Sequence, residues 1–238
     1  MTISKSTTSL AIEWINIPSG TFMMGSPTAE IDRDENEIQH LVTISAFKMS
    51  KFAVTFEQYD NFCKNTKRYK PDDEDWGRGK QPVINVSWHD AKAFASWLDC
   101  RLPTEAEWEY ACRSGTTTPF NTGNNLTARQ ANYDGQTPYG NYSKGECRRK
   151  VIPVGYFSPN TWGLCDMHGN IFEWCSDWLG DLDTKAQTNP QGPSEGNRKV
   201  MRGGCYASSA KYCRSAYRSS GYPNQRDYCF GFRVVLLE

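Results

Sequence analysis

The 238-residue chain lacks an excess of charge of either sign, because its 27 Lys and Arg balance its 27 Asp and Glu. Binders of nucleic acids and of anionic membranes depend on clustered, uncompensated cations, so this balance argues against both kinds of partner. The chain also lacks any apolar run that approaches the roughly 18 residues of a membrane helix. We therefore expect neither a nucleic-acid partner nor a membrane span.

Catalytic signatures are also scarce. The chain has no Gly-x-Ser-x-Gly, no phosphate-binding glycine loop and no dinucleotide fingerprint, so nothing indicates an organic cofactor. Its three histidines, at 40, 89 and 168, are too widely separated to favour a histidine-held catalytic metal. Its nine cysteines are odd in number and include no Cys-x-x-Cys, which disfavours a complete disulfide framework and a zinc ribbon. We expect most of them to be small buried residues in a reduced protein.

The start of the chain differs in composition from the rest. Residues 1–11 are rich in Ser and Thr without an apolar stretch, which predicts a disordered lead or linker and no secretory signal. Residues 12–238 contain 8 Trp, 11 Phe and 12 Tyr, and we expect them to form one globular domain. As written, the chain is predicted to be cytoplasmic. Surface display is the alternative if an export or anchoring segment has been removed.

Residue patterns predict an α+β fold with a high content of irregular loops. There is no βαβ alternation, which argues against a doubly wound or barrel enzyme. Between residues 116 and 200 regular signals nearly vanish, and such a stretch is typical of functional or metal-held loops. Alternation predicts strands, and apolar spacing behind the capping residues Thr55, Ser87 and Thr104 predicts helices. The expected strands cover 12–17, 21–24 and 41–52, the expected helices 55–64, 88–98 and 104–114, and further regular signals 150–155 and 171–178.

Two carboxylates with seven-residue spacing form the first candidate site. A loop that folds back could bring Asp166 and Glu173 to one hard cation. The backbone carbonyls of Gly169 and Ile171 would then complete the all-oxygen shell that calcium prefers. In the alternative, Asp166 caps backbone amides and Glu173 pairs with an arginine. The spacing alone leaves both interpretations open.

The second candidate is the C-terminal segment 202–235, which holds five of the chain's 12 Tyr among Ser, Gly, Cys and Ala. Tyr supplies rigid contact area at little entropic cost and Ser supplies adaptable hydrogen bonds, so this composition is typical of a recognition surface. The alternative is a C-terminal β-meander whose Tyr and Phe belong to the core. A regular frame runs through the segment. It comprises Arg202, Gly203, Gly204, Arg214, Ala216, Arg218, Gly231, Phe232 and Arg233.

Ordered motifs over residues 12–236 resemble the formylglycine-generating-enzyme (sulfatase-modifying factor) domain. This resemblance implies a variant of the C-type lectin fold for residues 12–238. It also implies that Asp166, Gly169, Ile171 and Glu173 bind a structural Ca²⁺. The motifs are IPSGTFMMGS at 17–26, RLPTEAEWE at 101–109, DMHGNIFEW at 166–174 and GFR at 231–233.

The resembled family includes copper-dependent oxidases that convert a sulfatase cysteine to formylglycine, ergothioneine-type sulfoxide synthases and non-catalytic binding modules. The oxidases carry two metal-binding cysteines five residues apart. Here Ser208 stands at the first of these positions and Cys213 at the second, counted from Gly204. Because a cuprous site needs both thiolates, this difference argues against oxidase activity. The competing hypothesis is a copper-dependent or other metal-dependent oxidase of peptide thiols, of the formylglycine-generating type, that uses Cys205 or Cys213 with Cys229.

The C-terminal frame is similar, more narrowly, to the variable region of target proteins of diversity-generating retroelements. In those proteins, adenine substitution in AAC codons restricts which residues occur between frame positions. This resemblance implies a non-catalytic protein whose frame holds a lectin-type scaffold, while exposed side chains bind a macromolecular ligand, expected to be a protein. The ligand-binding residues it implies are Cys205, Tyr206, Ala207, Ser208, Ser209, Tyr212, Tyr217, Ser219, Ser220, Gly221, Tyr222, Tyr228, Cys229 and Phe230.

Overall fold

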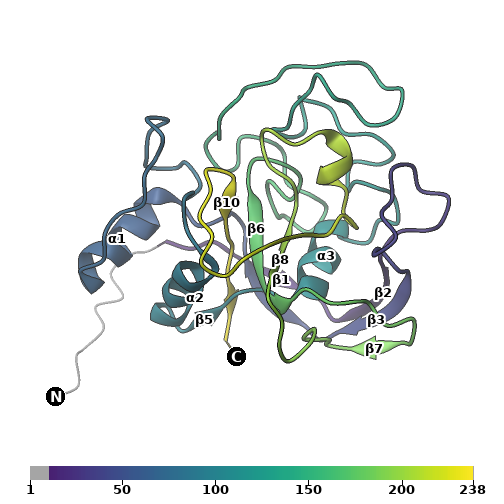
Figure 1. Cartoon of the computed structure of the whole chain (residues 1–238), viewed down its shortest axis with the longest axis horizontal. Helices are drawn as coiled ribbons and strands as arrows, with labels where there is room; N and C mark the ends of the chain where they lie inside the picture. The colour runs from purple at the N-terminus through teal and green to yellow at the C-terminus, as the bar shows by residue number, and fades with distance from the viewer. Residues whose placement is uncertain (1–10, 238) are drawn as a thin grey trace.

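A computed structural model describes residues 11–237, so the predicted disordered lead, residues 1–11, lies almost wholly outside the described part (Figure 1). Within residues 11–237 no helix has the length and apolarity needed to cross a membrane. The helices are α1 (Phe56–Thr66), α2 (Trp88–Trp97), α3 (Glu105–Arg113) and the 3₁₀ turn η1 (Ala210–Cys213). The strands are β1 (Trp14–Ile17), β2 (Gly20–Met24), β3 (His40–Ile44), β4 (Phe47–Ser50), β5 (Cys100–Arg101), β6 (Phe172–Trp178), β7 (Gln187–Thr188), β8 (Lys199–Arg202), β9 (Ser219–Gly221), β10 (Phe230–Gly231) and β11 (Val235–Leu236).

The strands form three small sheets, which confirms the α+β class. Their orders are β1-β4-β11-β5, β10-β6-β8-β9 and β2-β3-β7. The end of the chain enters two of these sheets. β10 pairs in parallel with β6, beside which it lies in Figure 1. β11 lies between β4 and β5. The C-terminal segment is therefore built into the scaffold formed by the earlier residues.

The three predicted helices are confirmed with their caps. The side chains of Thr55, Ser87 and Thr104 each accept a hydrogen bond from the third helical residue, whose side chain accepts one in return from the cap backbone. These reciprocal bonds satisfy amide groups that a helix leaves free at its start. Helix α1 runs two residues past the predicted end and stops where Lys67 adopts a left-handed conformation. The stacked rings of Tyr59 and Phe94 join α1 to α2 at 5.6 Å.

The predicted strand over 41–52 is wrong as one element. The chain turns at 45–46, so β3 pairs with β2 while β4 pairs with β1 in a different sheet. The signal at 150–155 also gives no strand. There the Asn170 side chain accepts a hydrogen bond from Ile152 N and donates one to Ile152 O, and so takes the place of a neighbouring strand. The signal at 171–178 is confirmed as β6.

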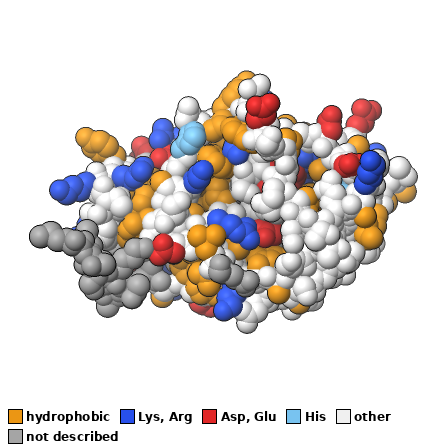
Figure 2. All heavy atoms as spheres, turned by 90° about the horizontal axis from the view of Figure 1, so that it is seen from below, with side chains coloured by type: hydrophobic (Ala, Val, Ile, Leu, Met, Phe, Trp, Pro, Cys, Tyr) orange, Lys and Arg blue, Asp and Glu red, His pale blue; other side chains and the backbone are white. Residues whose placement is uncertain are grey.

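Acidic side chains lie inside the molecule along α3, every residue of which is buried. Because burying a carboxylate is costly without a partner, three interior glutamates predict interior cations. Glu105 and Glu109 find arginines of the C-terminal frame, as described below, whereas Glu107 pairs with Arg101. At the surface, Figure 2 shows Lys and Arg side chains together with Asp and Glu side chains on the same face, in keeping with the balanced composition.

Candidate functional site

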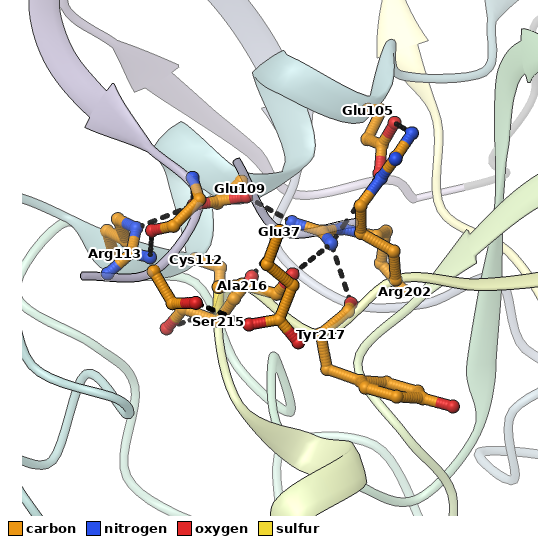
Figure 3. Close-up of polar contacts among 12 residues, drawn as sticks. Glu37, Glu105, Glu109, Cys112, Arg113, Arg202, Ser215, Ala216 and Tyr217 are labelled. Atoms are coloured by element: carbon orange, nitrogen blue, oxygen red, sulfur yellow. Dashed lines mark hydrogen bonds and ion pairs between the residues drawn. The ribbon is translucent and has the colours of Figure 1, made fainter. Parts of the chain in front are cut away.

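The frame arginines are buried in ion pairs with the N-terminal half of the chain. Arg202 pairs with Glu109 of α3, and its guanidinium also donates to the carbonyl oxygens of Ser215, Ala216 and Tyr217 at 2.9, 2.9 and 2.6 Å (Figure 3). One side chain thereby holds α3 against the backbone of residues 215–217. Figure 3 shows the Tyr217 ring pointing away from this cluster.

Arg214 holds the loop before β3 against the C-terminal segment in a similar way. It donates to both carboxylate oxygens of Glu37 at 2.7 Å and to Glu30 at 2.7 Å. Burial raises the pKa of Glu37, but the hydrogen bonds and charge of Arg214 outweigh burial and hold that pKa below its usual value. Glu37 is therefore a buried carboxylate whose charge depends on Arg214.

Two further arginines complete the frame. Arg218 donates to both oxygens of Glu105 at 2.7 and 2.8 Å, and Arg233 does the same to Glu173. The glycines of the frame are required sterically. A Cβ on Gly204, at φ +75°, would lie 2.5 Å from Cys213 Sγ, and one on Gly231 would lie 2.4 Å from Val83 O. The frame thus has the scaffold role that the sequence predicted.

Eight of the fourteen predicted ligand-binding residues reach the surface. Tyr222, Tyr228 and Tyr212 are 57%, 48% and 36% exposed. The Tyr222 ring lies 4.7 Å from the guanidinium of Arg198, and Tyr212 contacts the half-buried Tyr217 with ring centroids 5.0 Å apart. We call these eight positions the C-terminal surface. They are the exposed Ala207, Tyr212, Tyr222 and Tyr228, and the half-buried Ser209, Tyr217, Ser219 and Ser220.

The expectation of an exposed side chain is wrong for the other six positions, which are buried. Phe230 belongs to β10 and packs against Trp174, with ring centroids 5.4 Å apart. Gly221 lies against the same indole, where a Cβ would come within 2.6 Å of it. In irregular backbone no fixed period says which side chains turn inward, so composition alone could not separate the two sets. The buried positions are Cys205, Tyr206, Ser208, Gly221, Cys229 and Phe230.

Trp76 is a neighbour of this surface that sequence reasoning missed. It is half-buried, and its ring centroid lies 5.3 Å from that of Tyr206 and 6.4 Å from that of Tyr228. It belongs to an acidic loop far from the C-terminal segment in sequence. A tryptophan within an otherwise polar loop was the available signal, because loops rarely need so large an apolar side chain for packing.

The predicted calcium loop shows features of both interpretations. Asp166 Oδ2 accepts from Gly155 N at 2.7 Å, and Glu173 pairs with Arg233 and accepts from Trp108 Nε1, as the alternative requires. However, Asp166 Oδ1 is buried without a hydrogen-bond partner. Burial raises the pKa of Asp166 to about 6, helped by the charge of Glu173. This unpartnered oxygen favours a hard cation, whereas both oxygens of Glu173 are already bonded to Arg233.

The residues named for a copper site are arranged differently from an oxidase pair. Ser208 Oγ accepts from Cys205 N at 3.0 Å and lies 3.4 Å from Cys205 Sγ. Cys213 is fully buried, and burial raises its pKa well above the usual value, which opposes the thiolate form. Cys205 and Cys229 do meet, with their sulfurs 2.9 Å apart. Within residues 11–237 no group of three His, Cys, Asp or Glu side chains is placed to hold a metal.

Comparison with known proteins relates this geometry to a family. The family model for a sulfatase-modifying factor enzyme 1-like domain matches residues 2–237. Formylglycine-generating enzyme of Mus musculus is 30% identical over 277 residues, which cover 93% of this chain and 74% of that protein. Among solved structures, PvdO from Pseudomonas aeruginosa is similar with a TM-score of 0.79 and 28% identity, covering 94% of both chains. Treponema denticola variable protein 1 has a TM-score of 0.76 and 27% identity, covering 94% of this chain and 95% of that one.

These similarities define the architecture further. The mixed sheets and few helices form the C-type lectin fold of the formylglycine-generating-enzyme type, as the motifs implied. The similar proteins include an enzyme and a variable protein. Function therefore has to be argued from the site rather than from the fold.

Proposed function

We propose, since the chain belongs to the family of sulfatase-modifying factor enzyme 1-like domains, that it is a non-catalytic member which binds a protein ligand through its C-terminal surface. The proposal rests on a difference in burial between two sets of residues within the C-terminal segment 202–235. Its frame arginines are buried in ion pairs with distant glutamates, whereas tyrosines between them are exposed. The similarity to Treponema denticola variable protein 1 supports a surface that tolerates diversification.

Rigid backbone beneath changeable side chains suits such a role. Four frame arginines attach the segment at widely spaced points, so exposed side chains are held by a backbone that ligand binding need not order. Binding costs less when fewer groups must be immobilised. Tyrosine adds contact area with only two side-chain torsions, which lowers that cost again.

Formylglycine-generating oxidase activity is the second candidate, favoured by the identity to the mouse enzyme. Residue 208 argues against it, because copper would need a thiolate at this position. The chain has a serine there, and its hydroxyl accepts a hydrogen bond from Cys205 N. Copper(I) titration with oxygen and a cysteine-containing sulfatase peptide tests this candidate. We expect no stoichiometric copper and no aldehyde. Stoichiometric binding that disappears in Cys213→Ser, with aldehyde formation, would establish the oxidase instead.

Two matched libraries displayed on yeast test the binding proposal. The first randomises Ala207, Tyr212, Tyr222 and Tyr228, and the second randomises the four frame arginines 202, 214, 218 and 233. Protease resistance of the displayed protein measures folding, and selection against hen lysozyme, used as a probe, measures binding. We expect the first library to remain mostly folded and to yield lysozyme binders, while the second unfolds. Equal loss of folding in both libraries, or no binder from a folded first library, would overturn the proposal.

A further inference from the structure

Two thiols from separate parts of the C-terminal segment meet beneath its surface. Cys205 precedes η1 and Cys229 precedes β10, yet their sulfur atoms lie 2.9 Å apart. Within residues 11–237 this is the one pair of thiols at hydrogen-bond distance. The side chains are only 3% and 7% exposed. The pair is therefore preformed and shielded from large reagents.

The surroundings distinguish the two sulfurs. The hydrogen bond between the two sulfurs lowers the pKa of Cys205 despite burial, and the Ser208 hydroxyl, 3.4 Å from Cys205 Sγ, adds to that effect. The same contact and burial raise the pKa of Cys229. Cys205, which also faces the Ser208 hydroxyl, is thus the sulfur better able to carry negative charge. A thiolate next to a thiol is the arrangement in which an oxidised sulfur is captured by its neighbour.

We propose that Cys205 and Cys229 form a redox site that hydrogen peroxide converts into a disulfide bond. The Cys205 thiolate attacks one peroxide oxygen and the O–O bond breaks, which gives a sulfenic acid at Cys205 and hydroxide. Cys229 sulfur then attacks Cys205 sulfur, the S–O bond breaks, and the Cys229 proton leaves with the oxygen as water. The hydroxide takes up the proton that Cys205 released on forming its thiolate, so that in total two thiols are oxidised to one disulfide and one peroxide is reduced to two waters.

Size and distance favour this oxidant and this product. Because the two side chains are almost fully buried, a small peroxide can reach them where a bulky disulfide such as oxidised glutathione cannot. Sulfurs in a disulfide are separated by about 2.0 Å, so the pair has to close by about 1 Å. Because Cys229 N and O are already bonded to Asp227 Oδ1 and Phe172 N, this approach falls mainly to the two side chains.

The bond would join two parts of the molecule next to the C-terminal surface. Tyr206 follows Cys205 and Tyr228 precedes Cys229, and both rings contact Trp76. A disulfide would therefore fix the spacing of the aromatic group beside Tyr228. The inference does not depend on the proposed ligand binding, because cross-linking is measured without any ligand.

Peptide mapping of the folded protein tests the inference. The full chain is treated with limiting hydrogen peroxide, alkylated in denaturant and digested with trypsin without reduction. Cleavage at Arg202, Lys211, Arg226 and Arg233 places the two cysteines in peptides 203–211 and 227–233, each with a single cysteine. We expect these peptides to be recovered cross-linked before the more exposed Cys147 is oxidised. Oxidation of Cys147 first, with both peptides recovered alkylated and separate, would overturn the proposal.

Variants separate the roles of the two sulfurs. In Cys229→Ser, Cys205 should stop at the sulfenic acid, which dimedone labels in peptide 203–211. In Cys205→Ser, dimedone should label neither peptide. Cys213→Ser is the matched control, because Cys213 is buried in the same region without a thiol partner, and it should leave the cross-link unchanged. Loss of the cross-link in folded Cys213→Ser, or its formation with Cys213 in the wild type, would show that the pair is assigned wrongly.

Discussion

The division between frame and surface predicts very different costs for substitutions within one short segment. Arg214→Met removes both guanidinium bonds to Glu37 and leaves that buried carboxylate with the Ser26 hydroxyl and a backbone hydrogen bond from Asp34. Breaking a buried ion pair by removal of one partner costs about 3–5 kcal/mol. Glu30 loses its arginine as well, so we expect a loss of unfolding free energy toward the upper end of this range.

A matched control in the same segment is Arg226→Met. Arg226 also bonds a carboxylate, that of Asp90 at 2.7 Å, but its side chain is largely exposed. Exposed pairs contribute at most about 1 kcal/mol, so this variant should remain near wild-type stability. Tyr222→Ala should likewise cost at most about 1 kcal/mol, because it loses an exposed cation–π contact to Arg198.

Urea unfolding followed by tryptophan fluorescence measures all three variants. The frame account requires Arg214→Met to be clearly less stable than Arg226→Met and Tyr222→Ala. It would be refuted by Arg214→Met and Arg226→Met of equal stability, or by a Tyr222→Ala variant as unstable as Arg214→Met. Equal stability of the two arginine variants would show that Arg214 does not hold the scaffold. A Tyr222→Ala variant as unstable as Arg214→Met would show that Tyr222 belongs to the core.

Three further predictions concern single sites. Burial raises the pKa of Asp177 to about 7, so the folded state holds a proton that the unfolded state releases near pH 4; this stabilisation is complete below about pH 4 and is lost progressively as the pH rises to about 7. Asp177→Asn should therefore reduce the fall in unfolding free energy between pH 5 and pH 8 by about 3 kcal/mol relative to wild type, and an unchanged fall in urea titrations would contradict the assignment. Gly221→Ala should lower the unfolding free energy by about 1–3 kcal/mol, because the new Cβ would collide with Trp174. Ser219→Ala, at a half-buried position nearby, should change it little. Equal losses of stability in urea would contradict the contact. If Asp166 and its neighbours bind calcium, the ion at 100 times its Kd should add about 2.7 kcal/mol to the unfolding free energy. The protein should then have a higher Tm with calcium than with chelator, and Asp166→Ala should abolish this difference. Equal Tm values for the wild type would exclude the site.

Local signals in the sequence were sufficient for the helices. Thr55, Ser87 and Thr104 each lie three residues before a side chain that completes the capping box, and all of these contacts are between near neighbours in sequence. The frame could also be identified, because its Arg and Gly positions match the pattern of the variable regions that the segment resembles. Its partners could not. Arg214 and Glu37 are 177 residues apart, and no periodicity links them.

Side-chain burial within the C-terminal segment was the main failure of sequence reasoning. Tyr206 and Tyr228 have the same chemistry and similar polar neighbours, yet one ring is buried against Trp76 and the other is half exposed. Both rings contact Trp76, which lies 130 residues before Tyr206, and no local pattern in the sequence says how far each ring is covered. The absence of the strand expected at 150–155 has a related cause. At 150–155 a single side chain, Asn170, satisfies the backbone where a strand neighbour was expected.

Sequencing the encoding locus in several independent isolates tests the central claim most directly. The account predicts substitutions at template adenines, concentrated in codons for the C-terminal surface, such as Ala207, Tyr212, Tyr222 and Tyr228. Codons for Arg202, Arg214, Arg218 and Arg233 should remain unchanged, because those side chains hold the scaffold through buried ion pairs. An invariant segment 205–230 across isolates, or variation that falls equally on the frame arginines, would contradict the account.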